Sequence, residues 1–184
     1  MPNEVKVDGS SDPAGELVIS RIFAAPRELV FEAFTDPRHL MKWWGPHGCT
    51  VISCEADPRT GGNWSISMRS PRLLPQFAGR YPIKSPSTAA QNWTIEKQRG
   101  VYQEVIRPER LVFTYAFEDD AGRPLHQTVV KVNFTEDHGG TRITLHQAIF
   151  ETESARNDHV RGWSEALDHL NDYLARVPAA GIHR

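Results

Sequence analysis

Tyr102 and Glu104 are the residues whose types and spacing could do chemistry most directly, because they stand two apart in an alternating segment. Side chains two apart on a strand share a face, so an inward Tyr102 implies an inward Glu104. A buried carboxylate needs a partner or takes a raised pKa. Glu104 could therefore bind a ligand amine or hydroxyl, or act as a general base. The alternative is a salt bridge to an arginine at the rim of the sheet.

Other signatures of catalysis or metal binding do not occur in the sequence. Its 8 histidines form no His-x-x-x-His pair and there is no Cys-x-x-Cys, whereas zinc sites usually show such spacing. The nucleophile elbow, the phosphate loop and the dinucleotide fingerprint are also absent. We therefore expect no metal and no cofactor, and we assign no catalytic residue.

Local periodicity predicts the elements that must position these side chains. Period-2 alternation bounded by turn residues predicts strands at 17–23, 49–56, 63–69, 93–106, 111–118, 126–136 and 141–150. Two short helices are expected after the first strand, opened by Pro26 and Pro37. A C-terminal helix of about 20 residues carries an apolar stripe, formed by Val160, Trp163, Leu167, Leu170, Leu174 and Val177. The pattern indicates an α+β fold, in which a curved antiparallel sheet of six to seven strands wraps around this helix in the helix-grip arrangement.

One helix cannot fill the concave side of such a sheet, so we expect a cavity beside it, with the two short helices as a lid. The first half of the long helix offers Gly162 and Ala166 beside Trp163. A glycine inside a helix costs about 1 kcal/mol relative to alanine, and it can leave room for a ligand. For the aromatic members, plain core packing is the alternative. The candidate lining residues are Trp44, Trp64, Met68, Tyr102, Glu104, Phe113, Tyr115, Gly162, Trp163 and Ala166.

Five blocks of the sequence resemble one protein family. They are residues 18–46 with their Trp-Trp-Gly-Pro end, 57–64, 100–105, 108–113 and the Gly162-Trp163 pair. On these blocks, residues 17 to 176 resemble the START-like (SRPBCC) superfamily and, within it, the homologues of the activator of heat-shock-protein-ninety ATPase. The resemblance implies the helix-grip fold. It also implies two activities besides ligand binding, namely stimulation of a chaperone ATPase and a cyclase or hydrolase reaction on an aromatic, polyketide-like substrate.

Length and charge limit the class of protein. The 184 residues are expected to form a single domain over 16–178, behind a disordered polar tail at 1–15. A net charge of −2 does not favour a nucleic-acid partner. No signal peptide or membrane span is recognisable in the sequence, so a reducing cytoplasm is expected. Cys49 and Cys54 would point to opposite faces of one strand, which argues against a disulfide between them.

The segment 70–92 is longer than the family pattern and is basic. No Asp or Glu occurs from Pro58 to Ile95, while Arg72, Arg80 and Lys84 lie within the segment among apolar and proline residues. A basic flap beside a cavity would favour an anionic amphipathic ligand; a homodimer contact and a spacer are the alternatives.

Together these patterns predict a cytoplasmic, non-enzymatic protein that encloses a small hydrophobic or amphipathic molecule. We expect no nucleic-acid partner and no membrane insertion. A chaperone partner and an enzymatic reaction in the cavity are the alternative functions.

Overall fold

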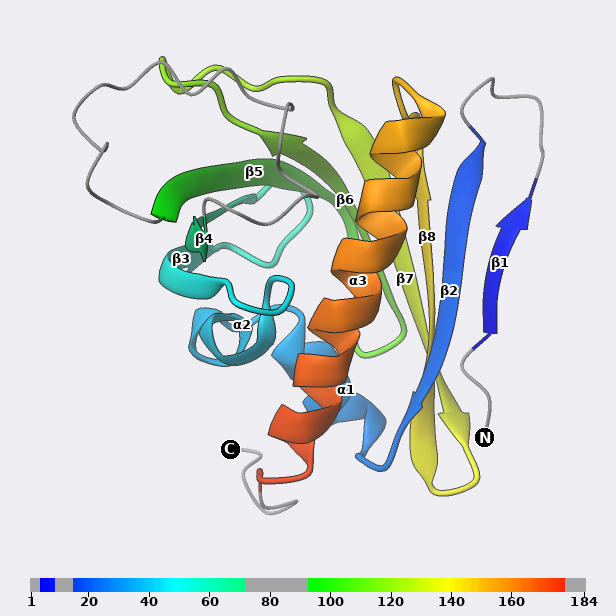
Figure 1. Ribbon diagram of the computed structural model, residues 1–184. Coiled ribbons are helices and arrows are strands. Elements are labelled where there is room, and N and C mark those ends of the chain that lie inside the picture. Colours follow the sequence, from blue (N-terminus) through cyan, green and yellow to red (C-terminus); the bar gives the residue numbers. More distant parts are fainter. Residues whose placement is uncertain (1–3, 9–14, 72–92, 178–184) are drawn as a thin grey trace.

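The computed structural model describes residues 4–8, 15–71 and 93–177 (Figure 1). Within these residues, eight strands form one antiparallel sheet in the order β1-β2-β8-β7-β6-β5-β4-β3. The strands are β1 (Glu4–Asp8), β2 (Glu16–Phe23), β3 (Thr50–Ala56), β4 (Asn63–Pro71), β5 (Trp93–Ile106), β6 (Arg110–Phe117), β7 (Thr128–Asp137) and β8 (Gly140–Ala148). The helices are α1 (Arg27–Ala33), α2 (Pro37–Trp43) and α3 (Glu153–Leu174).

The sheet curves around α3, which crosses its concave side (Figure 1). Leu167 and Leu170 of α3 are fully buried, as are Val132 of β7 and Leu145 of β8, whereas Lys131 on the opposite face of β7 is exposed. This arrangement confirms the helix-grip fold predicted from the sequence. It also makes the leucine-rich second half of α3 part of the core.

Capping residues explain where the helices begin. The side chain of Asp36 accepts the backbone N–H of Arg38 at 2.8 Å, and Pro37 follows as the first residue of α2. Thr152 accepts the backbone N–H of Ala155 at 3.1 Å, so α3 begins well before its apolar stripe. Both side chains satisfy N–H groups that would otherwise lack a partner at a helix start.

Strand β1 corrects the prediction of a disordered tail over 1–15. Residues Glu4–Asp8 pair with β2 in antiparallel register, from Glu4 opposite Ser20 to Asp8 opposite Glu16. Without β1, β2 would leave a row of unpaired backbone groups at the edge of the sheet. The polar composition of the tail favoured disorder, but its Glu-Val-Lys-Val-Asp alternation fits a strand. Residues 1–3 and 9–14 lie outside the described residues.

The two short helices cover one end of the concave side (Figure 1). Helix α1 packs against β7, where the rings of Phe31 and Phe134 meet edge-on with centroids 5.2 Å apart. Helix α2 lies against β3 and α3. The chain that follows α2 therefore runs between the sheet and α3, which places Trp44 and Gly45 beside the concave space.

Candidate functional site

A cavity opens between the chain that follows α2, strand β5 and the first half of α3. Its empty space is about 550 Å³, part of it open to solvent, but the centre of a water-sized sphere fits in only about 60 Å³ of it. The cavity is therefore a narrow slot. The lining residues are Trp44, Gly45, Pro46, Met68, Glu96, Gln98, Tyr115, Phe117, Asp158, His159, Gly162, Trp163 and Ala166.

The predicted lining residues divide into two groups in the structure. Those that border the cavity are Trp44, Met68, Tyr115, Gly162, Trp163 and Ala166. Gly162 leaves open space, because a Cβ at this position would meet nothing within 4 Å outside the backbone of its own helix. Trp64, Tyr102 and Phe113 lie deeper in the core and do not border the cavity, with ring centroids 5.7 Å apart for Trp64 and Phe113 and 6.1 Å apart for Tyr102 and Phe113.

Glu104 does not border the cavity, and the prediction that it shares the inward face of Tyr102 is wrong. The register of β5 against β6 shifts between Tyr102 and Glu104, which marks a β-bulge. An extra residue in a strand reverses the alternation beyond it. The Glu104 side chain is 37% exposed, and its Oε2 lies 3.2 Å from Nη2 of Arg110. The structure thus shows the alternative, a salt bridge to an arginine beside the β5–β6 turn.

Sequence reasoning missed two cavity residues of β5, Glu96 and Gln98. Both are buried, with exposed fractions of 8% and 2%. They share the inward parity of Tyr102, so counting back along the strand by twos would have found them. Asp158 and His159 of α3 were also missed, although they precede Gly162 by one helical turn and so lie on its side of the helix.

Two indole rings form the inner wall of the cavity. Trp44 and Trp163 meet edge-on with centroids 5.2 Å apart, and Trp44 stacks on Tyr115 at 6.5 Å. The indole N–H of Trp44 donates to Oε1 of Gln98 at 2.8 Å, and that of Trp163 donates to Oε1 of Gln147 at 2.7 Å. Packing and hydrogen bonding hold both rings in place, so this wall exists before any ligand arrives.

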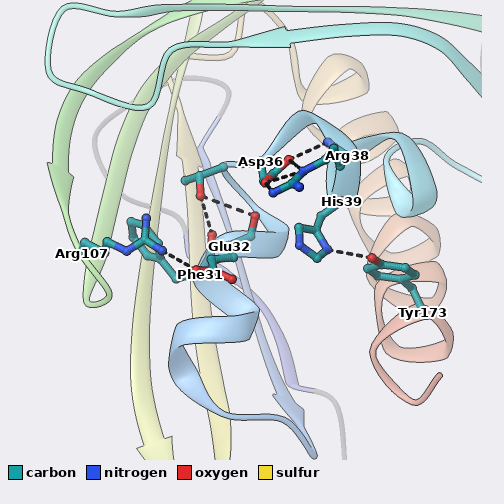
Figure 2. Close-up of polar contacts among 8 residues, drawn as sticks. Phe31, Glu32, Asp36, Arg38, His39, Arg107 and Tyr173 are labelled. Atoms are coloured by element: carbon teal, nitrogen blue, oxygen red, sulfur yellow. Dashed lines mark hydrogen bonds and ion pairs between the residues drawn. The ribbon is translucent and has the colours of Figure 1, made fainter. Parts of the chain in front are cut away.

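Polar contacts hold the lid against α3. His39 of α2 and the hydroxyl of Tyr173 share a hydrogen bond of 2.7 Å (Figure 2). Further along, Nδ1 of His169 donates to the backbone carbonyl of Gly45 at 3.0 Å. Because Gly45 borders the cavity, α3 positions both the helix side and the lid side of the slot.

A second, more polar hollow lies at the α1–α2 turn, beside Asp36, Arg38, Pro58 and Arg107. Nη2 of Arg38 donates to Oδ2 of Asp36 at 2.6 Å, and this side-chain hydrogen bond is the main cause that lowers the pKa of Asp36 (Figure 2). Nη2 of Arg107 lies 2.5 Å from Oε1 of Glu32. Each of these arginines already has a carboxylate partner, so the hollow attracts an anion only weakly.

Both cysteines are free thiols, as expected from their positions. Burial raises the pKa of Cys49 to about 11 and that of Cys54 to about 12. At neutral pH both sulfurs therefore stay protonated, and the protonated form is a poor nucleophile. Neither cysteine is a candidate for covalent catalysis.

Within the described residues, no three His, Cys, Asp or Glu side chains gather closely enough to hold a metal ion. In the same part of the chain, no helix has both the length and the apolar character needed to cross a bilayer. The residues of the basic flap, Arg72, Arg80 and Lys84, lie outside the described residues. Their proposed contact with an anionic ligand stays a prediction.

A family model matches residues 24–74 and 79–175, and its description is "Activator of Hsp90 ATPase homolog 1-like protein" (AHSA1). The match covers the lid, strands β3 to β8 and α3, which together build the cavity. The chain belongs to this family. The assignment confirms the resemblance found in the sequence blocks. Among curated proteins, no match to this AHSA1-like chain was found.

Solved structures share the fold of this AHSA1-like chain. The AHSA1 protein from Silicibacter pomeroyi is 24% identical with a TM-score of 0.70, over 88% of this chain and 98% of that one. A protein from Rhodobacter sphaeroides is 21% identical with a TM-score of 0.71, over 95% and 99% of the two chains. A protein from Mycobacterium smegmatis is 25% identical with a TM-score of 0.68, over 95% and 98%. Likeness at this level establishes the architecture and leaves the ligand to be argued from the cavity itself.

Proposed function

We propose that this AHSA1-like protein binds a small hydrophobic or amphipathic molecule in the slot between the lid, β5 and α3. The observation that carries the proposal is the open space beside Gly162, where a Cβ would meet nothing within 4 Å. A helix-interior glycine costs about 1 kcal/mol relative to alanine. A protein with no ligand to accommodate would be more stable with that space filled.

The cavity walls indicate the shape of the ligand. The slot is narrow, and Trp44, Tyr115 and Trp163 present aromatic surface to it. Aromatic side chains favour offset-stacked or edge-on contact with other rings. A flat, largely apolar molecule fits these walls best. Buried polar residues such as Gln98 would orient it, as is usual in small-molecule sites.

Binding is tested with a neutral apolar probe, N-phenyl-1-naphthylamine, whose fluorescence rises in apolar surroundings. We expect saturable uptake by the full chain and strongly reduced uptake by Ala166→Phe, because Ala166 borders the slot. The matched control is Ala175→Phe, the same change at an exposed position just after α3. Uptake that is absent, or that is equal in both variants, would contradict the proposal. Native mass spectrometry of protein from its own host would identify a retained ligand.

A cyclase- or hydrolase-type reaction is the second candidate, and one observation favours it. Glu96 and His159, side chains of the types that transfer protons, both border the slot. The set predicted from the sequence is not assembled, because Tyr102 and Glu104 lie away from the cavity. The ligand recovered by native mass spectrometry should then change mass on incubation with the wild type and stay unchanged with Glu96→Gln. A ligand unchanged by the wild type supports binding alone.

Stimulation of a chaperone ATPase is the third candidate, and it is supported by the description of the matching family model. An ATPase assay with the host's own chaperone tests it. Gly162→Leu places its new side chain at the slot and leaves the rest of the surface unchanged. Stimulation of the ATPase that survives this substitution is mediated by the surface, whereas stimulation that is lost with it needs the ligand.

A further inference from the structure

Two buried glutamines are placed alike at the cavity wall. Gln98 of β5 is 2% exposed and Gln147 of β8 is fully buried. The amide oxygen of each accepts an indole N–H, from Trp44 at 2.8 Å and from Trp163 at 2.7 Å. An indole N–H is a donor and never an acceptor, so the orientation of both amides is determined. Each amide nitrogen must face away from its indole.

The amide nitrogens of the two glutamines differ in what they meet. Nε2 of Gln147 donates to Oγ1 of Thr128 at 2.8 Å, and that hydroxyl donates to the backbone carbonyl of Tyr115 at 3.1 Å. Nε2 of Gln98 has one hydrogen-bond contact among the described residues, the sulfur of Met68 at 4.0 Å. A thioether is a weak acceptor. A buried N–H with so poor a partner is costly and needs an explanation.

Gln98 and Met68 both border the slot, whereas Gln147 does not. We propose that Gln98 is a ligand-recognition residue, whose amide N–H donates to a neutral oxygen acceptor, such as a ketone or quinone carbonyl, on a flat apolar ligand. The assignment rests on the proposed binding function and deepens it. It explains why a buried amide donor on a residue that borders the cavity has only a thioether as its described partner.

The charges around the slot favour a neutral acceptor over an anionic one. Its described lining residues include two acids, Glu96 and Asp158, and no lysine or arginine. Asp158 is already paired with Arg161 at 2.9 Å. A ligand carboxylate at Gln98 would lose its hydration against a wall whose described members include no lysine or arginine, while a carbonyl would gain the hydrogen bond at a smaller desolvation cost. Bound ligand therefore places its oxygen near Gln98 and its ring system against Trp44 and Trp163.

The test compares 9-fluorenone with fluorene, two flat molecules of nearly equal size of which only the first has a carbonyl. Both are titrated as competitors of N-phenyl-1-naphthylamine on the full chain. We expect fluorenone to compete about 3- to 10-fold more tightly, the range for one hydrogen bond. Gln98→Met should bring that ratio to about one, because it keeps the side-chain length and removes the donor.

Gln147→Met is the matched control. Like Gln98→Met, it removes the acceptor of an indole N–H in the cavity wall, here that of Trp163, so it reproduces any damage from a displaced tryptophan. The preference for fluorenone over fluorene should nevertheless stay as in the wild type. Infrared spectroscopy of bound fluorenone gives a readout that needs no variant, since a hydrogen bond lowers the carbonyl stretching frequency. The role of Gln98 would be overturned if the probe is taken up but fluorenone is not preferred, or if the carbonyl of bound fluorenone absorbs at the frequency that it has in a hydrocarbon solvent. Either result would leave the proposed function standing. Absence of probe uptake would overturn both.

Discussion

Replacing Gly162 with leucine should make the protein more stable and at the same time unable to bind. The position lies inside α3, and a Cβ there meets nothing within 4 Å. Leucine is among the best helix formers and glycine among the worst, a difference of about 0.5–1 kcal/mol in favour of the variant. For a chain of this size, about 1 kcal/mol raises the melting temperature by roughly 2–4 °C.

The same side chain should close the slot. Only about 60 Å³ of the cavity can hold the centre of a water-sized sphere. The additional carbon atoms of leucine would occupy that space. We expect the affinity for N-phenyl-1-naphthylamine to fall at least about tenfold, equivalent to about 1.4 kcal/mol. Most core substitutions that abolish binding also destabilise the fold. A substitution that raises the stability and lowers the affinity would therefore be specific to a preformed, unfilled cavity.

Thermal denaturation and probe titration of the wild type, Gly162→Leu and Gly100→Ala test this reasoning. Gly100 is the control for a glycine with no room, because a Cβ there would lie 1.7 Å from the carbonyl oxygen of Thr114 and 2.4 Å from Nε1 of Trp64. Gly100→Ala should destabilise the protein by about 1–3 kcal/mol, the usual cost of overpacking. A lower melting temperature for Gly162→Leu, or wild-type probe affinity in that variant, would refute the argument.

Three further outcomes are expected. In urea unfolding, Leu170→Ala should cost about 2–5 kcal/mol. Trp163→Ala should cost about 3–5 kcal/mol, because Trp163 is only 5% exposed and its indole N–H is hydrogen-bonded. Asp36→Ala should cost about 0.5–2 kcal/mol at pH 7. Because folding lowers the pKa of Asp36 below its ordinary 3.8, that contribution is present above pH 3.8 and is lost as the pH falls through the folded-state pKa. The difference in unfolding free energy between Asp36→Ala and the wild type should therefore shrink as the pH is lowered. Iodoacetamide should alkylate Cys49 and Cys54 far more slowly at pH 8 in the folded protein than in urea, since their pKa values are raised to about 11 and about 12; equal rates would show that the thiols are not buried.

Much of the architecture could be read from local patterns. The seven strands from β2 to β8 lie within two residues of the predicted ranges, because side chains alternate on any half-buried strand. The apolar stripe of α3 was equally clear, and the open space at Gly162 agrees with the expectation of room beside that helix. These features depend on the backbone geometry of one element at a time.

Other features depend on the partner of an element, and the sequence alone did not reveal them. Strand β1 forms because the edge of β2 is free to accept it. The inward parity of β5 reverses beyond Tyr102 because its pairing with β6 contains a bulge, which moves Glu104 to the salt bridge with Arg110. Both effects arise from pairing between strands, which a periodicity within one strand does not encode.

By itself, the sequence determined the family, the helix-grip fold and the neighbourhood of the cavity, because alternation, helical spacing and short motifs are local properties of the chain. Only the tertiary structure decided which polar groups face the slot. The hydrogen bond between Trp44 and Gln98 joins residues 54 apart in sequence, and it orients an amide donor that no pattern within β5 could orient. Recognition by a cavity depends on such long-range contacts, since its walls come from a lid, a strand and a helix that meet only when the chain is folded.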